Sequence, residues 1–86
     1  MKWTKDHTFI LKELENITVY IEERDIQGLF GREPGYMAFR IRNGLKAFTE
    51  LSKPIIDDLL KKGYLKKNQD KRILITRSGV EKLKEN

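Results

Sequence analysis

Apolar residues recur every three or four positions near the start of the chain. They are Ile10, Leu11, Leu14 and Ile17. This spacing predicts an amphipathic helix over residues 5–16, with Thr4 or Asp6 as its N-cap. Trp3 and Phe9 would flank the apolar stripe, as core residues or as contacts within a dimer.

The following segments predict a strand, a short helix and a turn. Residues 17–21, with the sequence ITVYI, are β-branched or aromatic and favour a short strand. Residues 22–31 are expected to form a short helix, because acids suit its first turn and Gly31 can end it. The sequence REPG at 32–35 places Pro and Gly at the central positions of a turn between two helices.

A second amphipathic pattern occupies the middle of the chain. Met37, Ile41, Leu45 and Phe48 lie at i, i+4, i+8 and i+11, which predicts a helix over residues 36–48. The opposite side of this helix has no carboxylate. It would display Phe39, Arg40, Arg42, Asn43 and Lys46.

Helix start and stop signals are clearest after residue 50. They predict a helix over residues 53–62, with Ser52 as N-cap, Pro54 in the first turn and Gly63 as the stop. Its outer face mixes acids with lysines.

A hairpin and a final helix are expected to follow. Residues 64–67 and 72–76 predict two short strands around a polar turn, NQDK. Thr76 is placed to cap the last helix, and Gly79 would allow it to pack closely.

From LSKPIIDDLLKKGYLKK to RILITRSGVEKL, the chain resembles a winged helix-turn-helix domain. Regulators of the MarR and PadR kind, and small archaeal and viral ones, share three features with it. A helix ends in a Gly-aromatic-Leu step, a basic two-stranded wing follows, and a Leu/Ile-Thr-x-x-Gly-x-x-x-Leu motif opens the last helix. The motif residues here are Ile75, Thr76, Gly79 and Leu83.

The resemblance covers residues 51–85 and matches the remainder by element order alone. It implies an α+β, mostly helical fold with a two-stranded C-terminal wing and a final helix. At 86 residues, the chain is expected to form this single domain over residues 1–86.

Positive charge is concentrated in two segments. Residues 36–48 carry three cations and no acid, and residues 61–72 carry six cations against Asp70 alone. Such clustering indicates a surface that binds a polyanion, or else a solvated face that keeps the protein soluble.

The wing is expected to contact DNA. Along it lie Lys66, Lys67, Lys71 and Arg72, with Asn68 and Gln69 at the tip. The cations would contact phosphates beside the minor groove, and the tip would bond sugar or base edges. The alternative is a lysine-rich edge that only prevents aggregation between strands.

Two helices are candidates for reading the major groove. The resemblance implies residues 53–62, but Asp57 and Asp58 there would face phosphates. The basic segment 36–48 is better equipped, since its arginines can contact guanine or phosphate, Asn43 adenine and Lys46 phosphate. We therefore favour residues 36–48. Residues 53–62 stay open as the alternative, with contacts from Lys53, Lys61 and Lys62.

The residues do not indicate an enzyme. His7 is the only histidine, cysteine is absent, and Ser52 and Ser78 lack a neighbouring base at motif spacing. We expect no catalysis, no metal, no cofactor and no small-molecule substrate. The apolar runs are too short to span a bilayer, so an intracellular, cytoplasmic location without membrane contact is expected.

The favoured function is that of a sequence-specific, double-stranded DNA-binding regulator acting as a homodimer. One alternative is a protein-interaction module whose acidic faces, residues 13–25 and 50–58, bind a basic partner. Another is an RNA or non-specific nucleic-acid binder in which Phe39 or Tyr36 stacks on bases.

Overall fold

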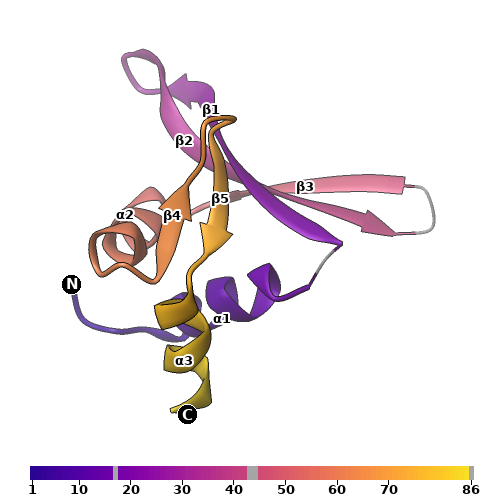
Figure 1. Ribbon diagram of the computed structural model, residues 1–86. Coiled ribbons are helices and arrows are strands. Elements are labelled where there is room, and N and C mark those ends of the chain that lie inside the picture. The colour runs from indigo at the N-terminus through magenta and orange to yellow at the C-terminus, as the bar shows by residue number, and fades with distance from the viewer. Residues whose placement is uncertain (17, 43–44, 86) are drawn as a thin grey trace.

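The computed structural model describes residues 1–16, 18–42 and 45–85, with side chains described outside residues 41–48. Its described part contains three helices and five strands. In order they are α1 (Lys5–Leu14), β1 (Val19–Gly28), β2 (Gly31–Arg42), β3 (Leu45–Leu51), α2 (Lys53–Lys61), β4 (Leu65–Lys67), β5 (Arg72–Ile75) and α3 (Arg77–Lys84). The strands form one antiparallel sheet in the order β3-β2-β1-β5-β4 (Figure 1).

The middle of the chain is a three-stranded meander. β1 and β2 form a long hairpin that turns at residues 29–30, and Gly28 pairs with Gly31 across the turn. Gly31 has a φ of 115°, a conformation that glycine adopts readily. The helices expected at 22–31 and 36–48 are therefore wrong, and so is the turn expected at 32–35, which lies within β2.

A period of two outweighs the helical spacing in β2. Tyr36 and Ala38 pack towards the core, whereas Phe39 stacks on Tyr20 at the opposite face of the sheet. Met37 and Ile41 fit both a helical period and this alternation. Aromatic and β-branched residues favour strands, and two neighbouring strands are available for pairing.

The expected mostly helical winged helix-turn-helix fold is also wrong. The five strands hold more residues than the three helices. In the described residues, a β-hairpin precedes α2 where the helix-turn-helix requires another helix. The protein is an α+β fold built on a five-stranded antiparallel sheet.

The elements predicted after residue 50 are confirmed, although Ser52, at the N-cap position of α2, makes no side-chain capping hydrogen bond. α2 ends at Lys61 with Lys62 as its C-cap, Gly63 follows with a φ of 82°, and the β4–β5 hairpin comes next. Thr76 caps α3, because its hydroxyl accepts from the Gly79 N–H at 3.1 Å. A Cβ on Gly79 would lie 2.3 Å from the Tyr64 carbonyl oxygen, so the expected close packing of α3 requires glycine.

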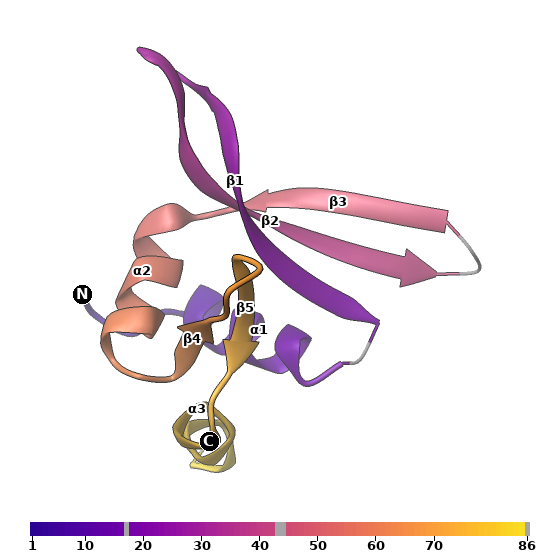
Figure 2. The ribbon, with the colours of Figure 1, turned by 45° about the horizontal axis from the view of Figure 1, so that its top comes forward.

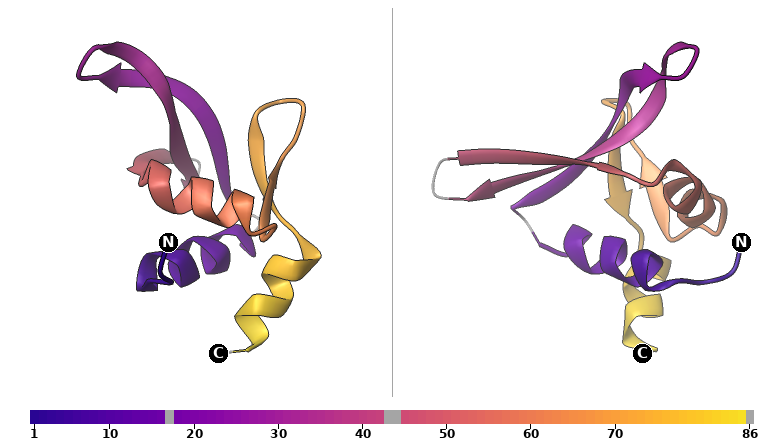
Figure 3. Two further views of the ribbon diagram at one scale, coloured as in Figure 1. Left: turned by 90° about the vertical axis from the view of Figure 1, so that its left-hand side faces the viewer. Right: turned by 180° about the vertical axis from the view of Figure 1, so that it is seen from behind.

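The core lies between the helices and one face of the sheet (Figure 3). It contains Ile10, Leu11, Ile21, Tyr36, Ile55, Ile56, Leu59, Leu65 and Ile73. Thus α1, α2 and four strands contribute to one apolar layer. The other face of the sheet bears no helix in the described part of the chain.

Two hairpin ends project from this layer in different directions (Figure 2). One is the end of the β1–β2 hairpin and the other is the end of the β2–β3 hairpin. β5 pairs with β1 only at Ile21 and Glu22, and β3 pairs with β2 from Tyr36 onward. Pro34 lies beyond these contacts, where β2 has a single neighbour and the missing N–H is tolerated.

Within the described residues, the helices are all too short or too polar to span a membrane.

Candidate nucleic-acid interface

The β4–β5 hairpin, residues 65–75, brings four cations together, and we call it the basic hairpin. The cations are Lys66, Lys67, Lys71 and Arg72. Lys67 pairs with Glu23 at 2.6 Å, and Arg72 pairs with Glu22 at 3.3 Å. Lys66 and Lys71 are exposed and form no ion pair with any residue that the structure describes. The hairpin therefore keeps an uncompensated positive charge.

Asn68 shapes the turn of the basic hairpin. Its Oδ1 accepts from the backbone N–H groups of Asp70 at 2.9 Å and Arg72 at 3.0 Å. Lys71, which ends the turn, has a φ of 62° in the left-handed region. Asn68 is thus a positioning residue, and the exposed Gln69 is the amide at the tip that is available to a ligand.

The helix-free sheet face continues the basic surface as a row of Arg72, Tyr20, Phe39 and Arg24. The Arg72 guanidinium lies 4.4 Å from the Tyr20 ring centroid, and Tyr20 stacks on Phe39 at 5.0 Å. Arg24 lies 4.9 Å from the Phe39 centroid. Each cation rests on an aromatic ring, an arrangement that keeps guanidinium groups oriented. We call these four residues the arginine–aromatic row.

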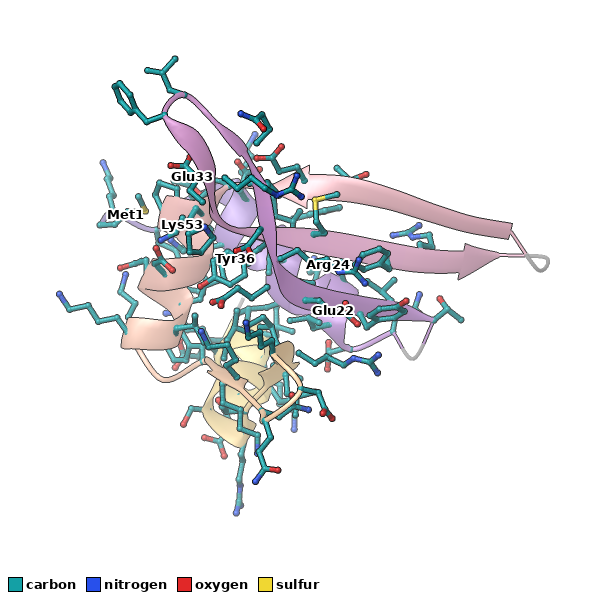
Figure 4. All side chains as sticks on the ribbon, turned by 90° about the horizontal axis from the view of Figure 1, so that it is seen from above. Met1, Glu22, Arg24, Glu33, Tyr36 and Lys53 are labelled. Carbon is teal, nitrogen blue, oxygen red and sulfur yellow. The ribbon has the colours of Figure 1, made fainter. Side chains whose placement is uncertain are left out.

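Glu22 ties the two arginines of the row together. Its carboxylate accepts from Arg24 at 2.9 and 3.0 Å and from Arg72 at 3.3 Å (Figure 4). The Arg24 hydrogen bonds, and to a smaller extent the one from Arg72, hold the pKa of Glu22 below its usual value despite partial burial. The side chains of Arg24 and Arg72 remain 52% and 45% exposed, so an incoming phosphate can reach both.

Asp57 on α2 is engaged within the protein. It accepts from the Tyr36 hydroxyl at 2.9 Å and from Lys53 Nζ at 2.7 Å. Partial burial works against its ionised form, but these two donors keep the pKa of Asp57 below its ordinary value. Burial and the Asp57 contact raise the pKa of the Tyr36 hydroxyl.

Asp58 is held by a second group of donors. Lys62 Nζ lies 2.7 Å from its carboxylate, His7 Nε2 lies at 3.0 Å and the Met1 amino group at 3.7 Å. The Lys62 hydrogen bond, more than the one from His7, lowers the pKa of Asp58. The side chain of Asp58 is only 9% exposed, so it does not present a free carboxylate to a phosphate backbone.

His7 is a structural residue. The Thr4 N–H donates to Nδ1 at 3.0 Å, which leaves the hydrogen on Nε2 for donation to Asp58. The Thr4 hydroxyl accepts from the His7 N–H in return, which completes a capping box at the start of α1. The ring is fully buried and stacks on Trp3 at 4.8 Å.

The lowered pKa values of Glu22, Asp57 and Asp58 predict acid sensitivity. A carboxylate whose pKa is lowered by folding stabilises the fold at any pH above its pKa in the unfolded chain. This stability is lost as the pH falls through the pKa of the group in the folded protein. The free energy of unfolding, measured by urea titration, should therefore decline steadily from pH 5 to pH 2. Asp58→Asn should reduce this slope, and an unchanged slope in the variant would contradict the assignment.

The structure does not bring the two predicted basic segments together. Arg40 pairs with Glu13 of α1, on the helix-covered side of the sheet, so it faces away from the arginine–aromatic row. Arg42 pairs with Leu45 in the β2–β3 register, and Lys46 pairs with Ile41. The side chains of Arg42 and Lys46, and all of Asn43, lie outside the described residues.

On α2, Lys53 and Lys62 are occupied by Asp57 and Asp58, whereas Lys61 is exposed without an ion pair among the described residues. Tyr36 and Phe39, the expected stacking residues, are only 3% and 6% exposed. Neither ring offers a base a free face.

The sequence analysis missed Tyr20, Glu22 and Arg24. Their alternation with Val19, Ile21 and Glu23 was a signal for a strand that places them on one face. In the part of the chain that the structure describes, no three His, Cys, Asp or Glu residues could hold a metal ion.

The fold and this surface together define a small α+β protein with a basic, arginine-lined sheet face. Neither the protein-family models nor the curated proteins and solved structures contain a match to the chain.

Proposed function

We propose that the protein binds double-stranded DNA through the basic hairpin and the arginine–aromatic row, and that it acts as a sequence-specific regulator. The observation that carries this proposal is the exposure of Lys66 and Lys71 on a two-stranded hairpin, beside two ring-supported arginines. Lysine and arginine side chains neutralise phosphates and release counterions, which supplies affinity for any duplex.

The existing ion pairs do not prevent phosphate binding. Lys67–Glu23 and Arg72–Glu22 involve lysine and arginine side chains that are 39% and 45% exposed. Exposed pairs of this kind contribute about 0–1 kcal/mol each, so exchanging a carboxylate for a phosphate costs little.

Base contacts would come from Gln69, which is exposed at the tip, and from Arg24, which would exchange its bonds to Glu22 for a base. Gln69 at the tip can pair with adenine, and Arg24 is long enough to reach guanine from the row. The proposed role of α2 is reduced to a phosphate contact from Lys61. Residues 36–48 have no groove-reading role in this proposal, because those of them that the structure describes belong to β2 and β3.

The alternative of an acidic surface for a basic partner has less support. Five acids of residues 13–25 and 50–58 already pair with cations of the same chain. They are Glu13, Glu22, Glu23, Asp57 and Asp58. A basic partner would have to displace these pairs.

The test is a salt titration of binding to a random duplex, followed by fluorescence anisotropy, with selection from a randomised duplex pool run in parallel. Five phosphate contacts, from Lys61 and the four cations of the basic hairpin, predict a slope of log affinity against log salt of about −4.5. An enriched motif is expected from the selection. Failure to bind at low salt would refute DNA binding, and binding without enrichment would refute sequence specificity.

A further inference from the structure

The β1–β2 arm, residues 24–35, ends in two large apolar side chains. Leu29 is 89% exposed and Phe30 is 97% exposed. The positive φ of this hairpin falls on Gly31, so the backbone at residues 29 and 30 accepts most residue types and requires neither Leu nor Phe. Leu29 and Phe30 therefore have no local reason to occupy this turn. Their exposure on a projecting arm indicates a contact with another surface.

A second open apolar feature lies on the helix-covered side of the sheet. It is a hollow of about 220 Å³ between α1 and the first three strands. Its apolar walls come from Phe9, Ile10, Val19, Ile21, Ala38, Phe39 and Leu51. Thr49 and the Glu13–Arg40 ion pair complete its lining. Phe9 on its rim is 55% exposed. Because a cavity of about 150 Å³ accommodates benzene, this hollow has room for the ring of a phenylalanine.

The arm cannot fill the hollow of its own chain. β1 lines the hollow at Val19 and Ile21 and reaches the arm tip at Gly28. At about 3.3 Å per residue, the tip lies roughly 25 Å beyond Ile21 along the strand. The views agree that the arm points away from the helices (Figures 1 and 3).

We propose that two copies of the chain form a two-fold dimer in which each arm inserts Phe30 into the hollow of the other copy. Leu29 then packs on the rim at Phe9. A second copy is the occupant, because the same chain carries both the apolar tip and the apolar hollow. A two-fold arrangement covers both tips and both hollows. This inference does not depend on DNA binding, since none of the cations of the basic hairpin and the arginine–aromatic row lines the hollow.

The oligomeric state tests the first part of this inference. Sedimentation velocity should show a dimer for the unmodified chain. Phe30→Ser should raise the dimer dissociation constant by about a hundredfold or more, because every dimer loses two anchors. Leu74→Ser, which alters an apolar side chain on the opposite face, should leave it unchanged. An unmodified chain that stays monomeric at high micromolar concentration would overturn the inference.

Cysteine pairs test the second part, since the chain has no cysteine of its own. The double variant carries Leu29→Cys at the arm tip and Thr49→Cys at the rim of the hollow, and it keeps Phe30, the residue proposed to insert. Under mild oxidation it should form a covalent dimer. Each single variant should remain uncrosslinked. A covalent dimer of Leu29→Cys alone would show that two tips meet, and a crosslink within one chain would show a folded-back arm. Either result would overturn the proposal that each arm inserts into the hollow of the other copy.

Discussion

Replacing Lys66, Lys67, Lys71 and Arg72 by glutamine should lower the affinity for duplex DNA about a thousandfold at roughly 0.15 M salt. Each phosphate contact contributes about 0.9 to the salt slope, which is about fivefold in affinity at this concentration. The loss should be the same for random and selected duplexes, because phosphate contacts carry no sequence information. Fluorescence anisotropy over a range of salt concentrations measures both quantities.

The matched control removes the same charge elsewhere. It replaces the exposed cations of α1 and α3 that lie outside the proposed interface, namely Lys5, Lys12, Arg77 and Lys84. This variant should keep most of its affinity. Circular dichroism of both variants establishes that they fold. Equal losses in the two variants would mean that net charge, and not the basic hairpin, governs binding.

Leu59→Ala should destabilise the fold by about 2–5 kcal/mol. Leu59 is fully buried in the centre of the core, on the inner face of α2. Removing its side chain loses transfer free energy and leaves a cavity among rigid neighbours. A domain of this length has a free energy of unfolding of roughly 4–13 kcal/mol, so this one change removes a large share of it.

Urea unfolding followed by circular dichroism measures this effect. Leu74→Ala is the control, because it removes the same atoms from a side chain that is 36% exposed on the outer face of β5. Its effect should stay below about 1 kcal/mol. Comparable losses for the two variants would contradict the position assigned to the core.

The part of the fold that sequence reasoning predicted depends on short-range signals. Pro54 and Gly63 bound α2, and the Thr76 hydroxyl together with the space at Gly79 determines how α3 begins and packs. These effects act within a few residues or over one hairpin. They can therefore be read from one segment without knowledge of the rest.

The middle of the chain could not be read in this way. Met37 and Ile41 satisfy a helical period and a strand period equally, and the decision depends on partners from distant segments. Gly28 and Gly31 flank the hairpin turn and were the local signal for two strands, which the acids before them obscured. Pairing with β1 and β3 then determined the outcome.

The candidate site divides in the same manner. The basic hairpin was predicted because its cations are neighbours in sequence. The arginine–aromatic row was not predicted, because Arg24 and Arg72 come together only when β1 and β5 pair. The two carboxylates of α2 were expected to repel phosphates, yet they are satisfied by Tyr36 and His7 from elsewhere in the chain.

The central place of β1 in the sheet has consequences for the order of folding. β1–β2, β2–β3 and β4–β5 join strands that are adjacent in sequence, whereas Glu22 and Arg72 are 50 residues apart. Contacts between distant residues form slowly, because closing the intervening loop costs entropy first. We expect the two halves of the chain to gain structure early and to dock late through β1 and β5. The surface proposed to bind DNA includes residues on both sides of the β1–β5 pairing, so only fully folded molecules would possess it.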